Sequence, residues 1–246
     1  MLQQEYEQYT EEDFRVWKIL FERQIVNLQE TVAVKFLEGL EKINFSSERI
    51  PNFKETNLLL ERLTGWHIQA VLGIIPDKDF FELLGQKKFP ATCWLRKFSQ
   101  LDYLEEPDMF HDVFGHIPLL TDESYCNFLL GLSSIALKFL ENSEVIELMS
   151  RLYWFTIEFG LIQEKGVSKI YGAGIISSSG ETKYSLSDKP VHLPFDVANI
   201  LQTSFYKDHI QEKYFVVTSF EELYHCLPFL EMGIETFVKE KNTLIN

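Results

Sequence analysis

The chain has 246 residues, of which 46% are hydrophobic, 14% aromatic and 24% charged, and its formal net charge is -14. This length fits one large domain or two small ones, and the aromatic residues provide enough apolar volume for a substantial core. The negative charge argues against a nucleic-acid partner, which needs a basic face, and no apolar run in the sequence is long enough to span a membrane.

Apolar residues at helical spacing predict helices over 10–43, 53–65, 76–85, 122–141 and 143–163. Apolar, β-branched runs predict short strands over 67–75 and 89–96 and near 214–217. Residues 169–186, with their Ser/Gly turn, predict a β-hairpin, and a last helix follows the strand near 214–217. The expected fold is mostly α with small β ribbons, in a single compact domain.

The compartment is indicated by the cysteines and by the first residues. Cys93, Cys126 and Cys226 are odd in number and widely spaced, which is typical of a reducing compartment. The first fourteen residues are polar and acidic and lack the features of a secretory signal. We therefore expect a cytoplasmic protein with no membrane and no nucleic-acid partner.

Two histidines, His111 and His116, stand five residues apart in "FHDVFGH". On a regular α-helix their side chains would diverge by about 140°, so they could not share one metal ion. Gly115 and Pro118 would let the helix end or tighten between them. The spacing alone leaves two interpretations open, a pair of metal ligands or two histidines that packing tolerates.

Glu158 is the candidate for a third ligand. Its helical neighbours are apolar, and none of them is Lys or Arg. A buried carboxylate is costly unless it is paired, protonated or bound to a cation, although it could also reach solvent or a partner elsewhere in the fold. Two histidines and one carboxylate suit Fe(II) and O2 chemistry, and the same set with a bound water suits a zinc hydrolase.

Two further residues fit such a site. Arg96 follows an apolar run and could hold a substrate carboxylate through two parallel hydrogen bonds, although a surface cation at a strand end fits equally. Ser177 could orient a ligating imidazole, or it could belong to a plain hairpin turn. The other histidines have no ligand-like neighbours in the sequence and are interpreted as structural or surface residues: His67, His192, His209 and His225.

Three stretches, taken together and in this order, resemble the pterin-dependent aromatic amino acid hydroxylases: "LDYLEEPDMFHDVFGHIPLL", "RLYWFTIEFGL" and "KIYGAGIISSSGETKYSL". The resemblance is greatest to the compact bacterial branch and covers nearly the whole chain. It implies one catalytic domain of this family over residues 1–246, without its N-terminal regulatory domain or its C-terminal tetramerisation helix. A monomer is therefore expected.

The resemblance also implies an activity. The chain would hydroxylate the ring of a free aromatic amino acid, L-phenylalanine to L-tyrosine, in phenylalanine catabolism. It would need Fe(II), a tetrahydropterin as cosubstrate, and O2. The alternatives are a tryptophan 5-monooxygenase of the same family and, from a different class, a zinc hydrolase that uses the same three ligands.

The roles implied by the resemblance fall into four groups. The iron ligands would be His111, His116 and Glu158. The amino acid would contact Arg96 through its carboxylate, and its pocket would be lined by Pro107, Trp154, Phe159, Gly174 and Ser177. The pterin would stack on Phe80, face the backbone near Ile75 and meet Asp112 through water. Tyr153 would pack beside the iron, and Ser177 would also hydrogen-bond His111. Animal members carry Thr where this chain has Leu104, so no hydroxyl contact is expected at that point of the pocket wall.

Overall fold

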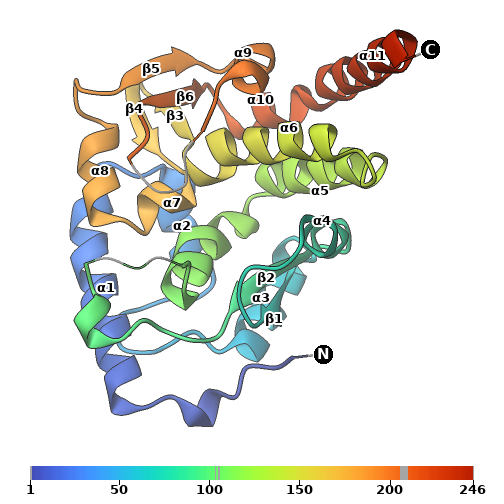
Figure 1. The fold of residues 1–246 in the computed structure, drawn as a ribbon. Helices are drawn as coiled ribbons and strands as arrows, with labels where there is room; N and C mark the ends of the chain where they lie inside the picture. Colours follow the sequence, from blue (N-terminus) through green and yellow to red (C-terminus); the bar gives the residue numbers. More distant parts are fainter. Residues whose placement is uncertain (1, 103, 105, 206–209, 246) are drawn as a thin grey trace.

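The fold is seen in a computed structural model that describes residues 2–102, 104, 106–205 and 210–245, with side chains up to residue 241. Helices form most of the molecule, and two small sheets lie on different sides of it (Figure 1). This confirms the expected mostly α fold with small β ribbons. In the described part of the chain, no helix has both the length and the apolar character that a membrane span requires.

The predicted helix over 10–43 is in fact two helices, α1 (Glu11–Leu28) and α2 (Val34–Lys42). α1 begins at Thr10, whose side chain accepts from the Asp13 backbone while the Asp13 side chain accepts from the Thr10 backbone. The break between the helices is caused by tertiary pairing, because the Ala33 N–H donates to the Ile170 carbonyl at 2.7 Å. Because Ile170 lies far along the chain, the sequence near the break gives no sign of it.

The next segment is a β-α-β unit. α3 (Phe53–Leu63) precedes β1 (His67–Val71), α4 (Asp77–Gly85) and β2 (Lys88–Thr92). β1 and β2 pair in parallel, with His67 opposite Lys88. These elements confirm that the predicted helices and strands exist, and α4 follows Pro76 and ends at Gly85, but each strand ends four residues earlier than predicted.

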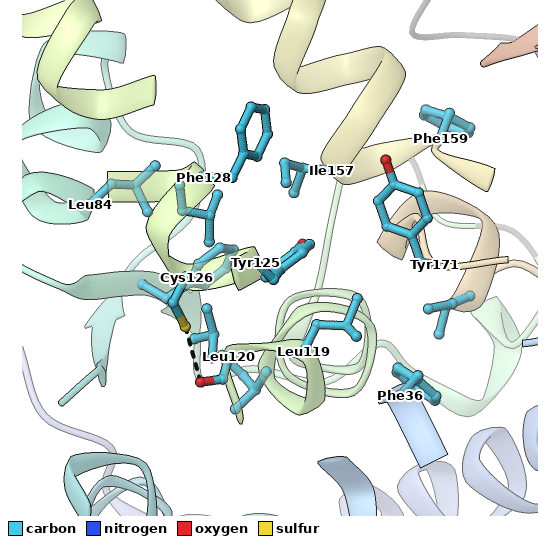
Figure 2. Close-up of a cluster of buried hydrophobic side chains, with 14 of the residues drawn as sticks. Phe36, Leu84, Leu119, Leu120, Tyr125, Cys126, Phe128, Ile157, Phe159 and Tyr171 are labelled. Atoms are coloured by element: carbon cyan, nitrogen blue, oxygen red, sulfur yellow. Dashed lines mark hydrogen bonds between the residues drawn. The ribbon is translucent and has the colours of Figure 1, made fainter. Parts of the chain in front are cut away.

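The centre of the molecule is formed by α5 (Glu123–Leu137) and α6 (Ser143–Tyr153), which lie beside each other (Figure 1). Figure 2 shows the buried cluster around the first turn of α5, where the Cys126 thiol donates to the Leu120 carbonyl at 3.2 Å. Tyr125 and Phe128 are also fully enclosed there. Burial of each such side chain stabilises the fold by about 1.5–3 kcal/mol.

The second sheet has the order β4-β3-β6-β5. β3 (Leu161–Glu164) and β4 (Val167–Ile170) form an antiparallel hairpin, and β6 (Lys213–Val217) pairs in parallel with both β3 and β5 (Val191–Pro194). The β3–β4 turn is made by Lys165 and Gly166 with φ of 50° and 84°, a pair of left-handed residues that suits a tight hairpin.

The hairpin predicted over 169–186 is therefore wrong, since the hairpin lies one segment earlier. After β4 the chain forms α7 (Ala173–Ile176) and α8 (Ser179–Ser185). The serines that suggested a turn form a helix start, because the Ser178 hydroxyl accepts from the Glu181 N–H at 3.3 Å. The predicted helix over 143–163 also ends early, at Glu158, and β3 follows it.

The remaining elements complete the body. They are the helices α9 (Val197–Gln202), α10 (Phe220–His225) and α11 (Leu227–Ile245), and the short helical turns η1 (Tyr6–Gln8), η2 (Phe98–Gln100) and η4 (Ile117–Thr121). α11 extends away from the other helices, and the C-terminus lies at its far end (Figure 1). α5 packs against both α4 and α10, so the central helices join the two sheets.

Candidate metal centre

The histidine pair lies on η3 (Phe110–His116), a helical segment of the π type. Hydrogen bonds in a π-helix run from residue i to i+5, so side chains five apart lie on the same face. The Nε2 atoms of His111 and His116 are accordingly 3.4 Å apart. The expectation that the helix ends near Gly115 is wrong. The helix widens at this point and continues directly into η4, so the histidines meet without a chain break.

Glu158 ends a second π-type segment, η5 (Trp154–Glu158), which continues from α6. Its Oε1 is 3.2 Å from the His116 Nε2, and its Oε2 is 3.5 Å from the His111 Nε2. Within the described residues, these three form the single group of His, Cys, Asp or Glu side chains placed to share a metal ion, with ligand atoms within 4.8 Å of one another. The structure thus brings together the three predicted ligands.

The carboxylate of Glu158 is held in its ionised form. Burial raises its pKa, but His116, His111, a hydrogen bond from His116 and the Gly174 N–H act in the opposite direction, and the pKa is lowered overall. Burial, and after it the charge of Glu158, raises the pKa of the Tyr153 hydroxyl well above its usual value. An ionised carboxylate beside two imidazoles is a suitable donor set for a divalent ion.

Ser177 orients one of the histidines. Its Oγ lies 2.8 Å from the His111 Nδ1, which leaves the Nε2 of His111 facing the other two ligand atoms. A contact of this kind fixes the orientation of a ligating ring. His116 is positioned by packing, because its ring lies 4.7 Å from the Phe89 ring and its Nδ1 is buried with no hydrogen-bond partner among the described residues.

Arg96 is paired with a residue that the sequence analysis missed. The Nε and Nη2 of Arg96 donate to the two carboxylate oxygens of Asp108 at 2.9 and 2.8 Å, and Asp108 is fully buried. Asp108 also accepts from the His111 N–H at 3.2 Å, so it links the guanidinium to the ligand helix. The sequence signal that could have found Asp108 is an acidic residue two positions before a histidine-bearing helix and three before His111, a typical place for an N-terminal cap.

Some of the residues predicted to line the amino acid pocket lie close together. The Trp154 ring lies between the rings of Phe159 at 4.7 Å and Phe205 at 5.1 Å. Gly174 faces this group, since a Cβ on it would lie 2.7 Å from the Phe159 ring. Pro107 is half-buried beside Asp108 in the chain, and Leu104 is half-buried too. Tyr103 and His209 lie outside the described residues.

The residues predicted to meet the pterin come from α4, from the segment before it and from η3. Phe80, on α4, meets Tyr153 edge-on with ring centroids 5.2 Å apart, and Ile75 lies in the segment that leads into α4. Asp112 is next to His111 and accepts from the N–H and the hydroxyl of Thr92, each at 2.8 Å. Its carboxylate therefore joins the ligand helix to the end of β2.

The fold and the ligand set define a class of enzyme. The family described as biopterin-dependent aromatic amino acid hydroxylase matches residues 5–235, and the chain belongs to this family. Two curated relatives are the phenylalanine-4-hydroxylases of Ralstonia nicotianae, 42% identical over 91% of this chain and 71% of the relative, and of Pseudomonas aeruginosa, 39% identical over 88% and 82%.

Solved structures of Chromobacterium violaceum phenylalanine hydroxylase are similar as well. The structure with bound iron(III) and 7,8-dihydrobiopterin has a TM-score of 0.90 and 40% identity, over 96% of this chain and 86% of that chain. The structure with bound iron and phenylalanine has a TM-score of 0.88 and 38% identity, over 95% and 87%.

Proposed function

We propose that this chain is an iron- and tetrahydropterin-dependent monooxygenase that converts L-phenylalanine to L-tyrosine. The observation that carries the proposal is the cluster of His111, His116 and Glu158, with ligand atoms 3.2–3.5 Å apart. Relatives named phenylalanine-4-hydroxylase support the substrate, and the C. violaceum structures with bound iron, dihydrobiopterin and phenylalanine support the ligands.

The three side chains fit an iron(II) ion. Ligand atoms at these separations can all bond one ion at about 2 Å, and the set leaves further coordination positions open. The iron, when bound, supplies the activation of O2 with electrons from the tetrahydropterin. The protein's part is to hold the ligands, orient both organic molecules and exclude water from the site.

The amino acid side of the site has a matching set of contacts. Asp108 uses the Nε–H and one N–H of Nη2 of Arg96, so the substrate carboxylate would bind the remaining N–H groups of Nη1 and Nη2. The aromatic ring would lie against Trp154 and Phe159. Because Asp108 also bonds the backbone of His111, the carboxylate anchor and a metal ligand are held at a fixed relative position.

On the pterin side, Phe80 provides an aromatic surface for stacking, and Asp112 provides a carboxylate for the polar edge of the ring.

The test is product analysis after incubation with Fe(II), tetrahydrobiopterin, O2 and an equal mixture of phenylalanine, tryptophan and tyrosine. We expect tyrosine as the main product, with no product when iron or the pterin is omitted. A main product of 5-hydroxytryptophan would instead assign the chain to the tryptophan branch of the family. Metal analysis that finds zinc, together with hydrolysis that needs no pterin, would contradict the proposal.

A further inference from the structure

The indole of Trp154 has its orientation set by a hydrogen bond as well as by packing. Its contacts with the rings of Phe159 and Phe205 are tilted by 37° and 38°. Stacking of this kind holds a ring between two surfaces but resists rotation in the ring plane only weakly. The Nε1–H of Trp154 donates to the Oε1 of Gln211 at 3.0 Å, and this bond defines which edge of the indole points to which side.

Gln211 lies 57 residues beyond Trp154, just before β6, and its exposed fraction is 5%. An indole nitrogen can only donate, so the side-chain oxygen of Gln211 must be the atom that faces it. The backbone N–H of Gln211 in turn donates to the Oε1 of Glu181 at 3.3 Å. The residue is therefore held from its backbone while its side chain reaches the indole.

Glu181 holds the segment before β6 at two points. It lies on α8 and is 8% exposed, and its second oxygen, Oε2, accepts from the Tyr214 hydroxyl at 2.6 Å. Tyr214 belongs to β6 and is fully buried. The carboxylate thus bonds residues 211 and 214 of the same segment and ties both to α8, the helix that follows Ser177.

We propose that Gln211 is a positioning residue for the aromatic amino acid pocket, which holds the Trp154 indole in place, and that Glu181 and Tyr214 hold Gln211. The inference rests on the proposed function, since that function places Trp154 in the pocket wall. Loss of the acceptor leaves the indole N–H of the half-buried Trp154 without this partner, so the indole turns toward another partner and the wall changes shape. The affinity for the amino acid then depends on the Trp154–Gln211 hydrogen bond, in which the amino acid takes no part.

The test is a double-mutant cycle of Gln211→Leu and Trp154→Phe. The readouts are the Kd of L-phenylalanine, measured by calorimetry on iron-loaded protein without pterin, and the KM of each substrate. We expect Gln211→Leu to weaken phenylalanine binding about tenfold, and less than about twofold when Trp154→Phe is already present. The KM for tetrahydrobiopterin should stay within about twofold in both backgrounds. Gln163→Leu, at an exposed position of β3, is the matched control and should change neither constant.

Tyr214→Phe is the milder variant, because it removes a single hydroxyl and keeps the buried ring. We expect it to weaken phenylalanine binding about threefold, again only when Trp154 is present. If Gln211→Leu does not fold, the result for Tyr214→Phe tests the role of Gln211 in its place. If a variant weakened phenylalanine binding equally with and without Trp154, the role of Gln211 would be overturned. Unchanged phenylalanine binding in both Gln211→Leu and Tyr214→Phe would overturn it as well. If Trp154→Phe itself left phenylalanine binding unchanged, the assignment of Trp154 to the pocket would fall as well, and the role of Gln211 with it.

Discussion

The two sides of the ligand cluster are built differently. On the side of α4, the loop residues Leu72 and Ile74 are 83% and 78% exposed, and Phe80 meets its neighbours edge-on. On the side of α7 and α8, the half-buried Ser177 contacts His111, and the buried Glu181 accepts a hydrogen bond from Tyr214. We infer that the amino acid meets a preformed pocket, whereas the pterin enters a side that can adjust. One metal centre would then lie between a fixed pocket for the amino acid and an adjustable site for the pterin.

The largest effect is expected where both sides meet, at Glu158. Glu158→Gln removes the negative charge that the two histidines face, so iron affinity and hydroxylation should fall by a factor of at least about 100. Iron content measured by mass spectrometry and product formation are the readouts, and the circular dichroism spectrum should be unchanged. His67→Gln, at an exposed histidine on β1, is the control. Full activity of Glu158→Gln would show that the carboxylate is no ligand.

The second largest effect should separate the two sides. Arg96→Ala removes the carboxylate anchor and leaves the buried Asp108 without its partner, so we expect a loss of about 2–5 kcal/mol in amino acid binding and a lower thermal midpoint. The KM for tetrahydropterin should change far less. The two KM values, with a thermal melt, check this. A KM for phenylalanine equal to that of the parent protein would rule out the anchor role.

The reverse pattern is expected at Phe80. Phe80→Ala removes a stacking surface, and the KM for tetrahydropterin should rise about tenfold because such contacts contribute about 0.5–1.5 kcal/mol beyond the buried area. The KM for phenylalanine should rise less than twofold. Phe98→Ala, at a half-exposed phenylalanine of η2, is the matched control. If both constants rose together, the result would indicate a general loss of structure.

The smallest effect concerns the thiols. Burial raises the pKa of Cys93 to about 11 and that of Cys126 to about 12. Only thiolates react readily, so both should be alkylated slowly at pH 8, and Cys93 should react first as the pH rises. Mass spectrometry of iodoacetamide-treated protein measures the order. Faster reaction of Cys126 would contradict the order expected from the half-buried Cys93 and the buried Cys126.

The candidate ligands could be suggested from the sequence, because a carboxylate in an apolar helix and two close histidines are local signals, and the family resemblance joined them into one set. The π-type winding could not be predicted by the usual reasoning, since that reasoning assumes 3.6 residues per turn. Asp108 and Gln211 were missed for a different reason. Their partners, Arg96 and Trp154, lie 12 and 57 residues away, and nothing in the local sequence indicates such pairs.

The errors in the fold have related causes. The break after α1 is made by pairing with Ile170, and a periodic pattern cannot show it. The serines at 177–179 fit both a hairpin turn and a helix start, and the choice depends on α7 packing against η3. Helix α4 was predicted well because Pro76 and Gly85 mark its boundaries locally, whereas β1 and β2 end four residues before their predicted ends.

The π-type segment η3 limits how this chain can change during evolution. A π turn contains about one residue more than an α turn, so removal of one residue between the histidines would let the helix return to α winding with the pair four apart. The histidines would still face one another, but the residues between them would change their position around the helix axis. Asp112, which lies between the histidines, would then lose its fixed relation to them. Gene variants that gain or lose a codon here should therefore be rarer than those that substitute one.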